Sequence, residues 1–274
     1  TDSCRRLHKH IKRIYEGGCI KRNDFLETYK YFGLRKLYWI GRRAYLWCIN
    51  TLTDLEIIQP LSHQSIIKRG LSRFLINHYD GYMGHNINTN QYFLGLGLMH
   101  YAIVRNTRPI HILCVGSRKG YVPAILALAC KDNHSGHVDF VDAGYDEDEP
   151  KKFWGGTGFW KKNNPATHFS KIGVNNVITT YVMTTAQYAK QHPDKTYQYI
   201  YIDSDHSFKG VQRDYRLFWP RLEKNGLMAF HDIVARGSVG TAEYGVWKFW
   251  KKIKQMHTIA FPFPQDSGLG LIQK

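Results

Sequence analysis

From residue 109 onward, short apolar segments alternate regularly with segments of helical pattern. Five of the apolar segments are rich in β-branched and aromatic residues, as strands are. The expected strands cover residues 110–115, 138–141, 177–182, 197–202 and 227–230, and the expected helices between and after them include residues 122–130, 185–191, 208–222 and 246–256. Repeated strand–helix units predict an α/β fold: a doubly wound, Rossmann-like, mostly parallel sheet. Residues 258–272 suit a closing antiparallel hairpin.

The first part of the chain does not show this alternation. Residues 1–50 hold twelve Lys and Arg against four Asp and Glu, a net charge of +8 out of +16 for the whole chain, with aromatic residues interleaved. Residues 61–104 have a helical pattern broken by glycines. We therefore expect a basic, mainly helical N-terminal extension over residues 1–105 and one α/β domain over residues 106–274.

The positive charge favours anionic partners, although a basic and merely solvated surface would look the same. Residues 1–50 could bind nucleic acid, or could lie on an anionic membrane and bring the α/β domain to a lipid-linked substrate. The apolar runs are too short to span a bilayer. Five scattered cysteines with no Cys-x-x-Cys pair indicate a reducing, intracellular compartment, so the expected location is cytoplasmic, with peripheral membrane association as the variant.

The first expected strand is followed by the turn Gly116-Ser-Arg-Lys-Gly120, and the second ends at Asp142. Glycine lets a backbone turn sharply and approach a ligand closely, and the next helix offers free amides. An acid at the end of the second strand can bind the two hydroxyls of a ribose. The turn lacks the Gly-x-Gly-x-x-Gly spacing of dinucleotide sites, and an ordinary strand-to-helix turn is the alternative.

The fourth and fifth expected strands end in acids and histidines. Asp203, Asp205 and His206 follow the fourth strand, and His231 with Asp232 closes the fifth. Because ligands bind at the carboxyl edge of such sheets, these five groups should converge there. They could hold a divalent cation, or His206 could act as a general base; helix capping is the competing explanation for each residue alone.

These motifs together resemble class I S-adenosylmethionine-dependent methyltransferases. The resemblance rests on Val115-Gly-Ser-Arg-Lys-Gly, Asp142, Ile202-Asp-Ser-Asp-His-Ser-Phe-Lys-Gly-Val and Leu222-Glu-Lys-Asn-Gly-Leu-Met-Ala-Phe-His-Asp. The run Asp-x-Asp-His-x-x-x-x-Val-x-x-Asp is similar to the small-molecule and sugar O-methyltransferase branch. The resemblance covers residues 109–274; the preceding residues match no family we can name.

The resemblance implies roles for particular residues. The cofactor contacts would be Gly116, Ser117 and Gly120 at the methionine part, Asp142 at the ribose, Met183 and Thr184 beside the adenine, and Asp203 at the methyl-transfer site. In metal-dependent relatives, acids at corresponding positions bind magnesium. The implied set here is Asp203, His231 and Asp232, with Mg2+ as a second cofactor. This set departs from the family at His231, because imidazole is a poorer magnesium ligand than carboxylate.

The leading functional hypothesis is an O-methyltransferase that acts on a hydroxyl of a sugar, glycolipid or secondary metabolite, with His206 and Asp203 as catalytic residues. A small-molecule or glycan acceptor is the expected partner. One alternative is an RNA or DNA methyltransferase that uses residues 1–50, although no Asn/Asp-Pro-Pro-Tyr/Phe motif and no evident Lys-Asp-Lys-Glu set occur. Another is a non-catalytic binding protein with this fold. The glycine- and tryptophan-rich segment 151–162 is expected to be either a lid or a loop whose aromatic residues pack into the core.

Overall fold

The computed structural model describes part of the chain, and all structural statements below concern that part. The described residues are 68–81, 84–85, 87, 92–145, 158–239, 242–253, 257–262 and 267–274. They belong to one compact unit that runs from Ser65 to Lys274. The expectations for residues 1–50 and for most of segment 151–162 lie outside the described residues.

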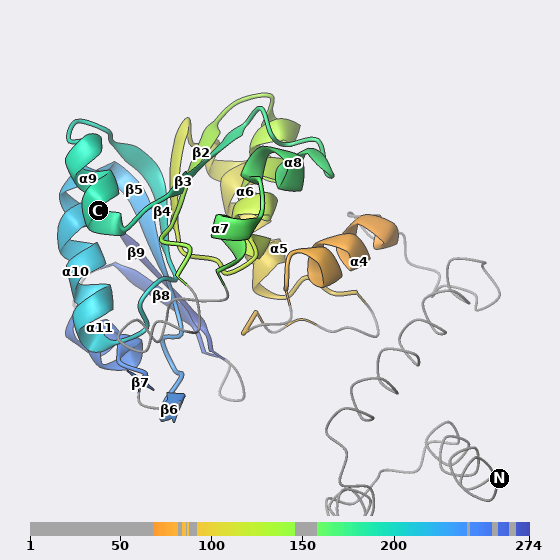
Figure 1. The fold of residues 1–274 in the computed structure, drawn as a ribbon. Helices are drawn as coiled ribbons and strands as arrows, with labels where there is room; N and C mark the ends of the chain where they lie inside the picture. Colours follow the sequence, from red (N-terminus) through yellow and green to blue (C-terminus); the bar gives the residue numbers. More distant parts are fainter. Residues whose placement is uncertain are drawn as a thin grey trace, which may run out of the picture. The chain divides into compact units, whose positions relative to one another are not determined.

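A seven-stranded sheet forms the centre of this unit, in the order β3-β2-β1-β4-β5-β9-β8 (Figure 1). The strands are β1 (His111–Val115), β2 (His137–Asp142), β3 (Ile178–Val182), β4 (Tyr197–Ile202), β5 (Leu222–His231), β8 (Thr258–Phe261) and β9 (Leu269–Gln273). Strands β1 to β5 pair in parallel, whereas β9 pairs antiparallel with both β5 and β8. The expected doubly wound α/β class with its closing antiparallel hairpin is confirmed.

Helices cover both faces of the sheet. One layer contains α4 (Arg69–His78), α5 (Leu96–Thr107), α6 (Tyr121–Asn133), α7 (Phe159–Lys162) and α8 (Pro165–Ser170); the other contains α9 (Thr185–Gln191), α10 (Phe208–Phe218) and α11 (Val246–Ile253) (Figure 1). Successive side chains of a strand point to opposite faces. In β1, Ile112 and Cys114 accordingly join the core beneath α4 to α6, while Leu113 and Val115 join the core beneath α9 to α11.

Helices α4 and α5 come before residue 106, yet they share a core with α6. Leu75 of α4 and Val104 of α5 are buried in the same apolar cluster as Ile125 of α6. These two helices therefore complete one layer of the α/β unit. The boundary between residues 105 and 106 stays a prediction. Among the described residues, no helix is long and apolar enough to cross a membrane.

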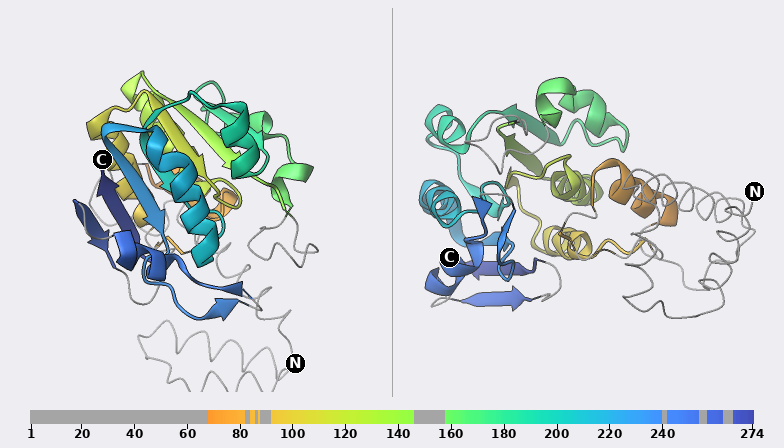
Figure 2. Two further views of the ribbon diagram at one scale, coloured as in Figure 1. Left: turned by 90° about the vertical axis from the view of Figure 1, so that its left-hand side faces the viewer. Right: turned by 60° about the horizontal axis from the view of Figure 1, so that its bottom comes forward.

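Two details of the chain differ from the expectation. Strand β5 begins at Leu222 instead of at residue 227, with a shift of register that pairs Tyr197 with Leu222 and Tyr199 with Leu227. The sequence Glu-Lys-Asn-Gly in between has the composition of a turn, and Asn225 does have a positive φ of 65°. The second difference is a short hairpin, β6 (Ser238–Val239) and β7 (Ala242–Glu243), that lies beyond the carboxyl ends of the parallel strands (Figure 2).

Candidate functional site

The glycine turn after β1 brings the ends of β1 and β4 together. Gly116 has φ of +71°, and a Cβ atom there would lie 2.3 Å from the carbonyl oxygen of Asp203. The amide of Asp203 donates to the carbonyl of Val115 at 2.8 Å, and the amide of Gly116 donates to that of Val141 at 2.8 Å. Only glycine satisfies both the conformation and the close approach. The turn therefore lies directly beside the first residue of the acid- and histidine-rich segment.

Ser117 and Gly120 shape the start of α6. Gly120 has φ of +92°, and a Cβ atom there would lie 3.0 Å from Phe169 and 3.2 Å from Trp160. The hydroxyl of Ser117 accepts a hydrogen bond from the amide of Val122 at 3.2 Å, which satisfies one of the free donors of the helix. Trp160 is buried, so this aromatic residue of the loop packs into the core.

Asp142 ends β2 with its carboxylate turned back toward the glycine turn. The amide of Gly144 donates to its Oδ1 at 2.8 Å, and the amide of Ser117 also donates to it. Burial raises the pKa of Asp142 to about 6; the two amide hydrogen bonds oppose this rise, and the negative charge of Asp203 adds to it. A half-buried carboxylate that accepts two amide hydrogen bonds and is mostly ionised at neutral pH fits a ligand with paired hydroxyls.

The next strand end provides an apolar surface. Val182 pairs with Asp142 across β3 and β2, and its side chain is 40% exposed. Met183 follows it and is half-buried. Thr184 caps α9: its hydroxyl accepts from the amide of Gln187 at 3.2 Å, and its own amide donates to that side chain at 2.9 Å. Thr184 can therefore contribute packing at this edge, but its hydrogen-bonding groups are already used.

A histidine and an aspartate meet across the loops that follow β4 and β5. His206 Nδ1 donates a hydrogen bond to Asp232 Oδ2, and its Nε2 lies 3.9 Å from Asp203 Oδ1. The side chain of His206 is 20% exposed, whereas those of Asp203 and Asp232 are 9% and 7% exposed. The imidazole is therefore the most exposed of these three side chains, and Nε2 is its nitrogen that is not hydrogen-bonded to Asp232.

The charges around His206 shift the protonation of the pair. Burial lowers the pKa of His206, but the charge of Asp232, its hydrogen bond and the charge of Asp203 outweigh burial and raise the pKa above its ordinary value of 6.5. Burial raises the pKa of Asp232, but the positive charges of His231 and His206 outweigh burial and hold this pKa far below its ordinary range. Asp232 is therefore ionised at neutral pH and orients His206.

His231 lies behind these groups with oxygen atoms at both ring nitrogens. Its Nδ1 lies 3.0 Å from Asp203 Oδ1 and 3.3 Å from Asp232 Oδ1. Its Nε2 lies 2.8 Å from the carbonyl oxygen of Gly84 and 3.0 Å from the hydroxyl of Ser267, which itself donates to that carbonyl. Burial lowers its pKa, but Asp203 and Asp232 raise it well above the ordinary value. The two carboxylates therefore favour the protonated form of this buried ring.

This arrangement bears on the expected magnesium site. A doubly protonated ring has no lone pair for a metal, so His231 does not fit as a ligand. Asp203, His206 and Asp232 each bring one ligand atom within 4.8 Å of the others. That set includes a nitrogen, whereas magnesium prefers oxygen ligands, and the imidazolium already compensates both carboxylates. The residues present do not fit magnesium well, so nothing in the described part of the chain supports the Mg2+ that the resemblance implies.

Asp205 does not join the group, in contrast to the expected convergence of five residues. Its Oδ1 accepts from the amide of Ser207 at 3.0 Å, and its Oδ2 lies 3.7 Å from Arg213. Its carboxyl group also packs on Gly210, where a Cβ atom would lie 2.1 Å from it. Asp205 therefore shapes the turn into α10 and is not part of the group of Asp203, His206 and Asp232.

Two contributors were not singled out from the sequence. Asp214, in the motif after His206, is fully buried and accepts hydrogen bonds from Ser204 and, at 2.7 Å, from Thr185. It thereby ties the loop after β4 to α9. Tyr244 follows the β6–β7 hairpin, and its ring lies 5.7 Å from that of His206. Asp214 is the last residue of the run Asp-x-Asp-His-x-x-x-x-Val-x-x-Asp, and this position could have indicated it. No local sequence pattern indicates Tyr244.

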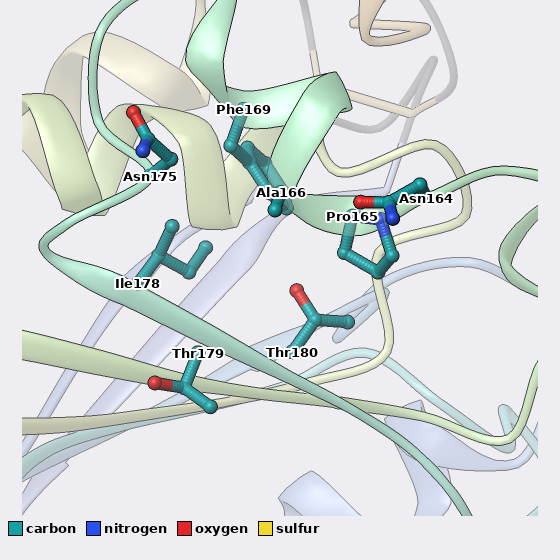
Figure 3. Close-up of a pocket in the computed structure, with 8 residues that line it drawn as sticks. All are labelled: Asn164, Pro165, Ala166, Phe169, Asn175, Ile178, Thr179 and Thr180. Carbon is teal, nitrogen blue, oxygen red and sulfur yellow. The ribbon is translucent and has the colours of Figure 1, made fainter.

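A small pocket of about 270 Å³ occurs elsewhere, between α8 and the first residues of β3 (Figure 3). Asn164, Phe169 and Thr180 are among its lining residues. The pocket residues Ile178 to Thr180 lie before the carboxyl end of β3, so the pocket is separate from the group around His206. We assign it no role.

Comparisons with known proteins show which fold this chain shares. Residues 113–233 match the family model of a methyltransferase domain. An O-methyltransferase from Bacillus cereus, solved in complex with S-adenosylhomocysteine, is 14% identical over 82% of this chain and 100% of its own, with a TM-score of 0.53. The O-methyltransferase TomG from Streptomyces achromogenes, solved with S-adenosylmethionine, is 11% identical over 82% and 95%, with a TM-score of 0.50. At such identities the likeness shows the fold alone. No curated protein matches the chain.

Proposed function

We propose that this chain, whose residues 113–233 are a methyltransferase domain of the class I fold, transfers the methyl group of S-adenosylmethionine to a hydroxyl group. The observation that carries the proposal is the hydrogen-bonded pair of His206 and Asp232 at the carboxyl edge of the sheet, next to the glycine turn. It combines a base for a hydroxyl proton with the edge at which this fold binds ligands.

The residues along the ends of β1, β2 and β3 fit the cofactor. Gly116, Ser117 and Gly120 form the turn at which the methionine part would lie, and Asp142 would accept from the ribose hydroxyls. The exposed apolar side chain of Val182 would border the adenine together with Met183 and Thr184. When bound, S-adenosylmethionine supplies a methyl group on a positively charged sulfur, so that transfer forms a carbon–oxygen bond, breaks a carbon–sulfur bond and leaves neutral S-adenosylhomocysteine.

His206 would remove the proton that the acceptor hydroxyl loses. Its Nδ1 proton is held by Asp232, which leaves Nε2 as the acceptor nitrogen on the accessible side of the ring. Asp232 also stabilises the imidazolium that forms when the proton arrives, as in other carboxylate–histidine pairs. The proton then leaves to solvent through the exposed edge of the ring. Correctly placed general bases accelerate such reactions by about 10²–10⁴-fold.

Asp203 would line the methyl-transfer site without moving a proton. The hydroxyl of Tyr201 donates to its Oδ2 at 3.1 Å, and His231 Nδ1 lies 3.0 Å from its Oδ1. Because both oxygens have neighbours within the protein, the carboxylate is held in one orientation. A fixed negative charge beside the glycine turn favours a positively charged ligand there.

We propose an acceptor hydroxyl on a sugar, a glycolipid or a secondary metabolite. The side chain of His206 is 20% exposed, which leaves part of it for contact with such an acceptor. The basic residues 1–50, which suggested nucleic acid or a membrane as the partner, lie outside the described part of the chain.

The proposal is tested by two measurements on the full chain. Calorimetry with S-adenosylhomocysteine should show binding to the unmodified protein and weaker binding to Asp142→Asn. Radiolabelled S-adenosylmethionine, incubated with a panel of sugar and phenolic acceptors, should then show label on at least one hydroxyl. Absence of cofactor binding would leave a non-catalytic protein with this fold and refute the proposal.

A further inference from the structure

The hairpin β6–β7 and the start of α11 are fixed against His206. The amide of Gly245 donates to the carbonyl of His206 at 2.7 Å. A Cβ atom on Gly245 would lie 2.1 Å from the amide nitrogen of Phe208, so only glycine permits this approach. The ring of Tyr244 packs edge-on to that of His206. Tyr244, Gly245 and the start of α11 are therefore held beside the proposed base, and Lys251 lies in the last turn of the same helix.

Trp247, in the first turn of α11, is surrounded by positive charge. The guanidinium carbon of Arg236 lies 4.5 Å from the ring centroid, and the ammonium groups of Lys251 and Lys248 lie 5.1 and 5.4 Å from it. The indole Nε1 donates to the carbonyl of Tyr244 at 3.0 Å and fixes the ring. Cations are attracted to the negative face of an aromatic ring. The ring itself carries no net charge, so only nearby acids could balance these three cations.

The acids nearby do not balance these cations. Glu243 pairs with Lys248 at 2.5 Å, and Asp232 is engaged by His206 and His231. Within the described part of the chain, no acidic side chain forms an ion pair with Arg236 or Lys251. Arg236 is exposed on the loop that leaves β5, four residues after Asp232. Arg236, Trp247 and Lys251 therefore form a net positive surface, which the hydrogen bond from Trp247 to Tyr244 joins to the residue packed on His206.

We infer that the acceptor carries an oxyanion, such as a phosphate or carboxylate, which Arg236 and Lys251 bind while the reacting hydroxyl lies at His206. This inference rests on the proposed function, because it assigns a recognition site to the same acceptor. Guanidinium groups bind oxyanions with two parallel hydrogen bonds, and the lysine adds a second charge. The ring of Trp247 holds both cations in place before the anion arrives.

The test uses inorganic phosphate as the probe and the indole N–H signal of Trp247 as the readout, identified by its absence in Trp247→Phe. Phosphate should shift this signal saturably in the protein loaded with S-adenosylhomocysteine, and less at high salt. In the double variant Arg236→Gln/Lys251→Gln, phosphate affinity should fall by about tenfold or more. Lys190→Gln, an exposed lysine on α9, is the matched control and should behave as the unmodified protein.

A second arm separates a site for the acceptor from a site for free phosphate. With a working acceptor, phosphate should inhibit methyl transfer competitively against the acceptor, and the double variant should raise KM with little change in kcat. Unchanged phosphate affinity in the double variant, or inhibition that is not competitive, would overturn the inference. Binding of S-adenosylhomocysteine is measured separately. A protein that does not bind it would refute the proposed function, and phosphate binding could still be interpreted on its own.

Discussion

The imidazole of His206 donates through Nδ1 to the Oδ2 of Asp232, across 26 positions of sequence and between the loops that follow two neighbouring strands. The bond fixes which nitrogen carries the proton, and it leaves Nε2 as the only nitrogen that can accept one. In a pair of this kind, the carboxylate fixes the tautomer and the orientation of the histidine, which can then act as a general base. The following predictions depend on it or on the groups that surround it.

The rate of methyl transfer should rise with pH as His206 loses its proton. Asp232, Asp203, His231 and Tyr244 face this ring, and the two acids raise its pKa above 6.5, so the rise should be centred above that value. In Asp232→Asn, the largest charge that raises the pKa is gone, so the centre moves to lower pH. Without the orienting carboxylate, kcat should also fall by about 100-fold or more. A pH–rate profile checks both, and an unmoved centre would contradict the pairing.

Cofactor affinity should depend on the ionisation of Asp142. Burial raises its pKa to about 6, and only the carboxylate form accepts two ribose hydrogen bonds. The affinity for S-adenosylhomocysteine should therefore fall as the pH drops through about 6. Calorimetry across this range should show the fall in the unmodified protein and a weak, flat profile in Asp142→Asn. Asp194→Asn, on the surface, serves as the control; a flat profile in the unmodified protein would refute the assignment.

Methyl transfer should not require a divalent cation. His231 Nδ1 lies 3.0 Å from Asp203 and 3.3 Å from Asp232, and the protonated ring that these acids favour would place a positive charge between them without a metal. Dialysis against EDTA should therefore leave kcat unchanged, and added Mg2+ should not raise it. His231→Asp restores an acid at this position and should bind Mg2+ in calorimetry, with thermal melting as the check on folding. A loss of activity in EDTA that magnesium restores would contradict this account.

Gly245→Ala should lower both the stability of the protein and kcat. The new methyl group would lie 2.1 Å from the amide of Phe208, which forces α11 and the loop of His206 apart. Overpacking of this kind costs about 1–3 kcal/mol of stability, and kcat should fall because His206 moves. Gly70→Ala is the matched control, since nothing lies within 4 Å of its added methyl group and Ala favours the helix. Equal melting temperatures and rates in both variants would show that the close approach is unimportant.

The sequence predicted the sheet well because each strand contrasts strongly with its neighbours. The strand 197–202 consists of Tyr and Ile with one Gln, and β4 has these same limits. Strand β5 was predicted too short because Asn225 and Gly226 suit a turn, whereas pairing with Tyr197 and the final Lys274 extends the strand beyond them. Local composition could not show a pairing that depends on distant residues.

The site was predicted in part for the same reason. Because parallel strands end at one edge, the proximity of Asp203, His206 and Asp232 followed from the order of motifs. The protonation of His231 did not, since it depends on the carbonyl of Gly84 and the hydroxyl of Ser267, more than 180 positions apart. Asp205 was expected at the same edge, but the turn into α10 uses its carboxylate.

The most direct test of the account is methyl transfer by His206→Asn, which keeps a polar side chain of similar shape but cannot accept the proton. With an acceptor from the panel and saturating S-adenosylmethionine, kcat should fall by about 100-fold or more, and calorimetry should show an affinity for S-adenosylhomocysteine within about twofold of the unmodified protein. Turnover retained in this variant at an unchanged cofactor affinity would show that His206 is not the base.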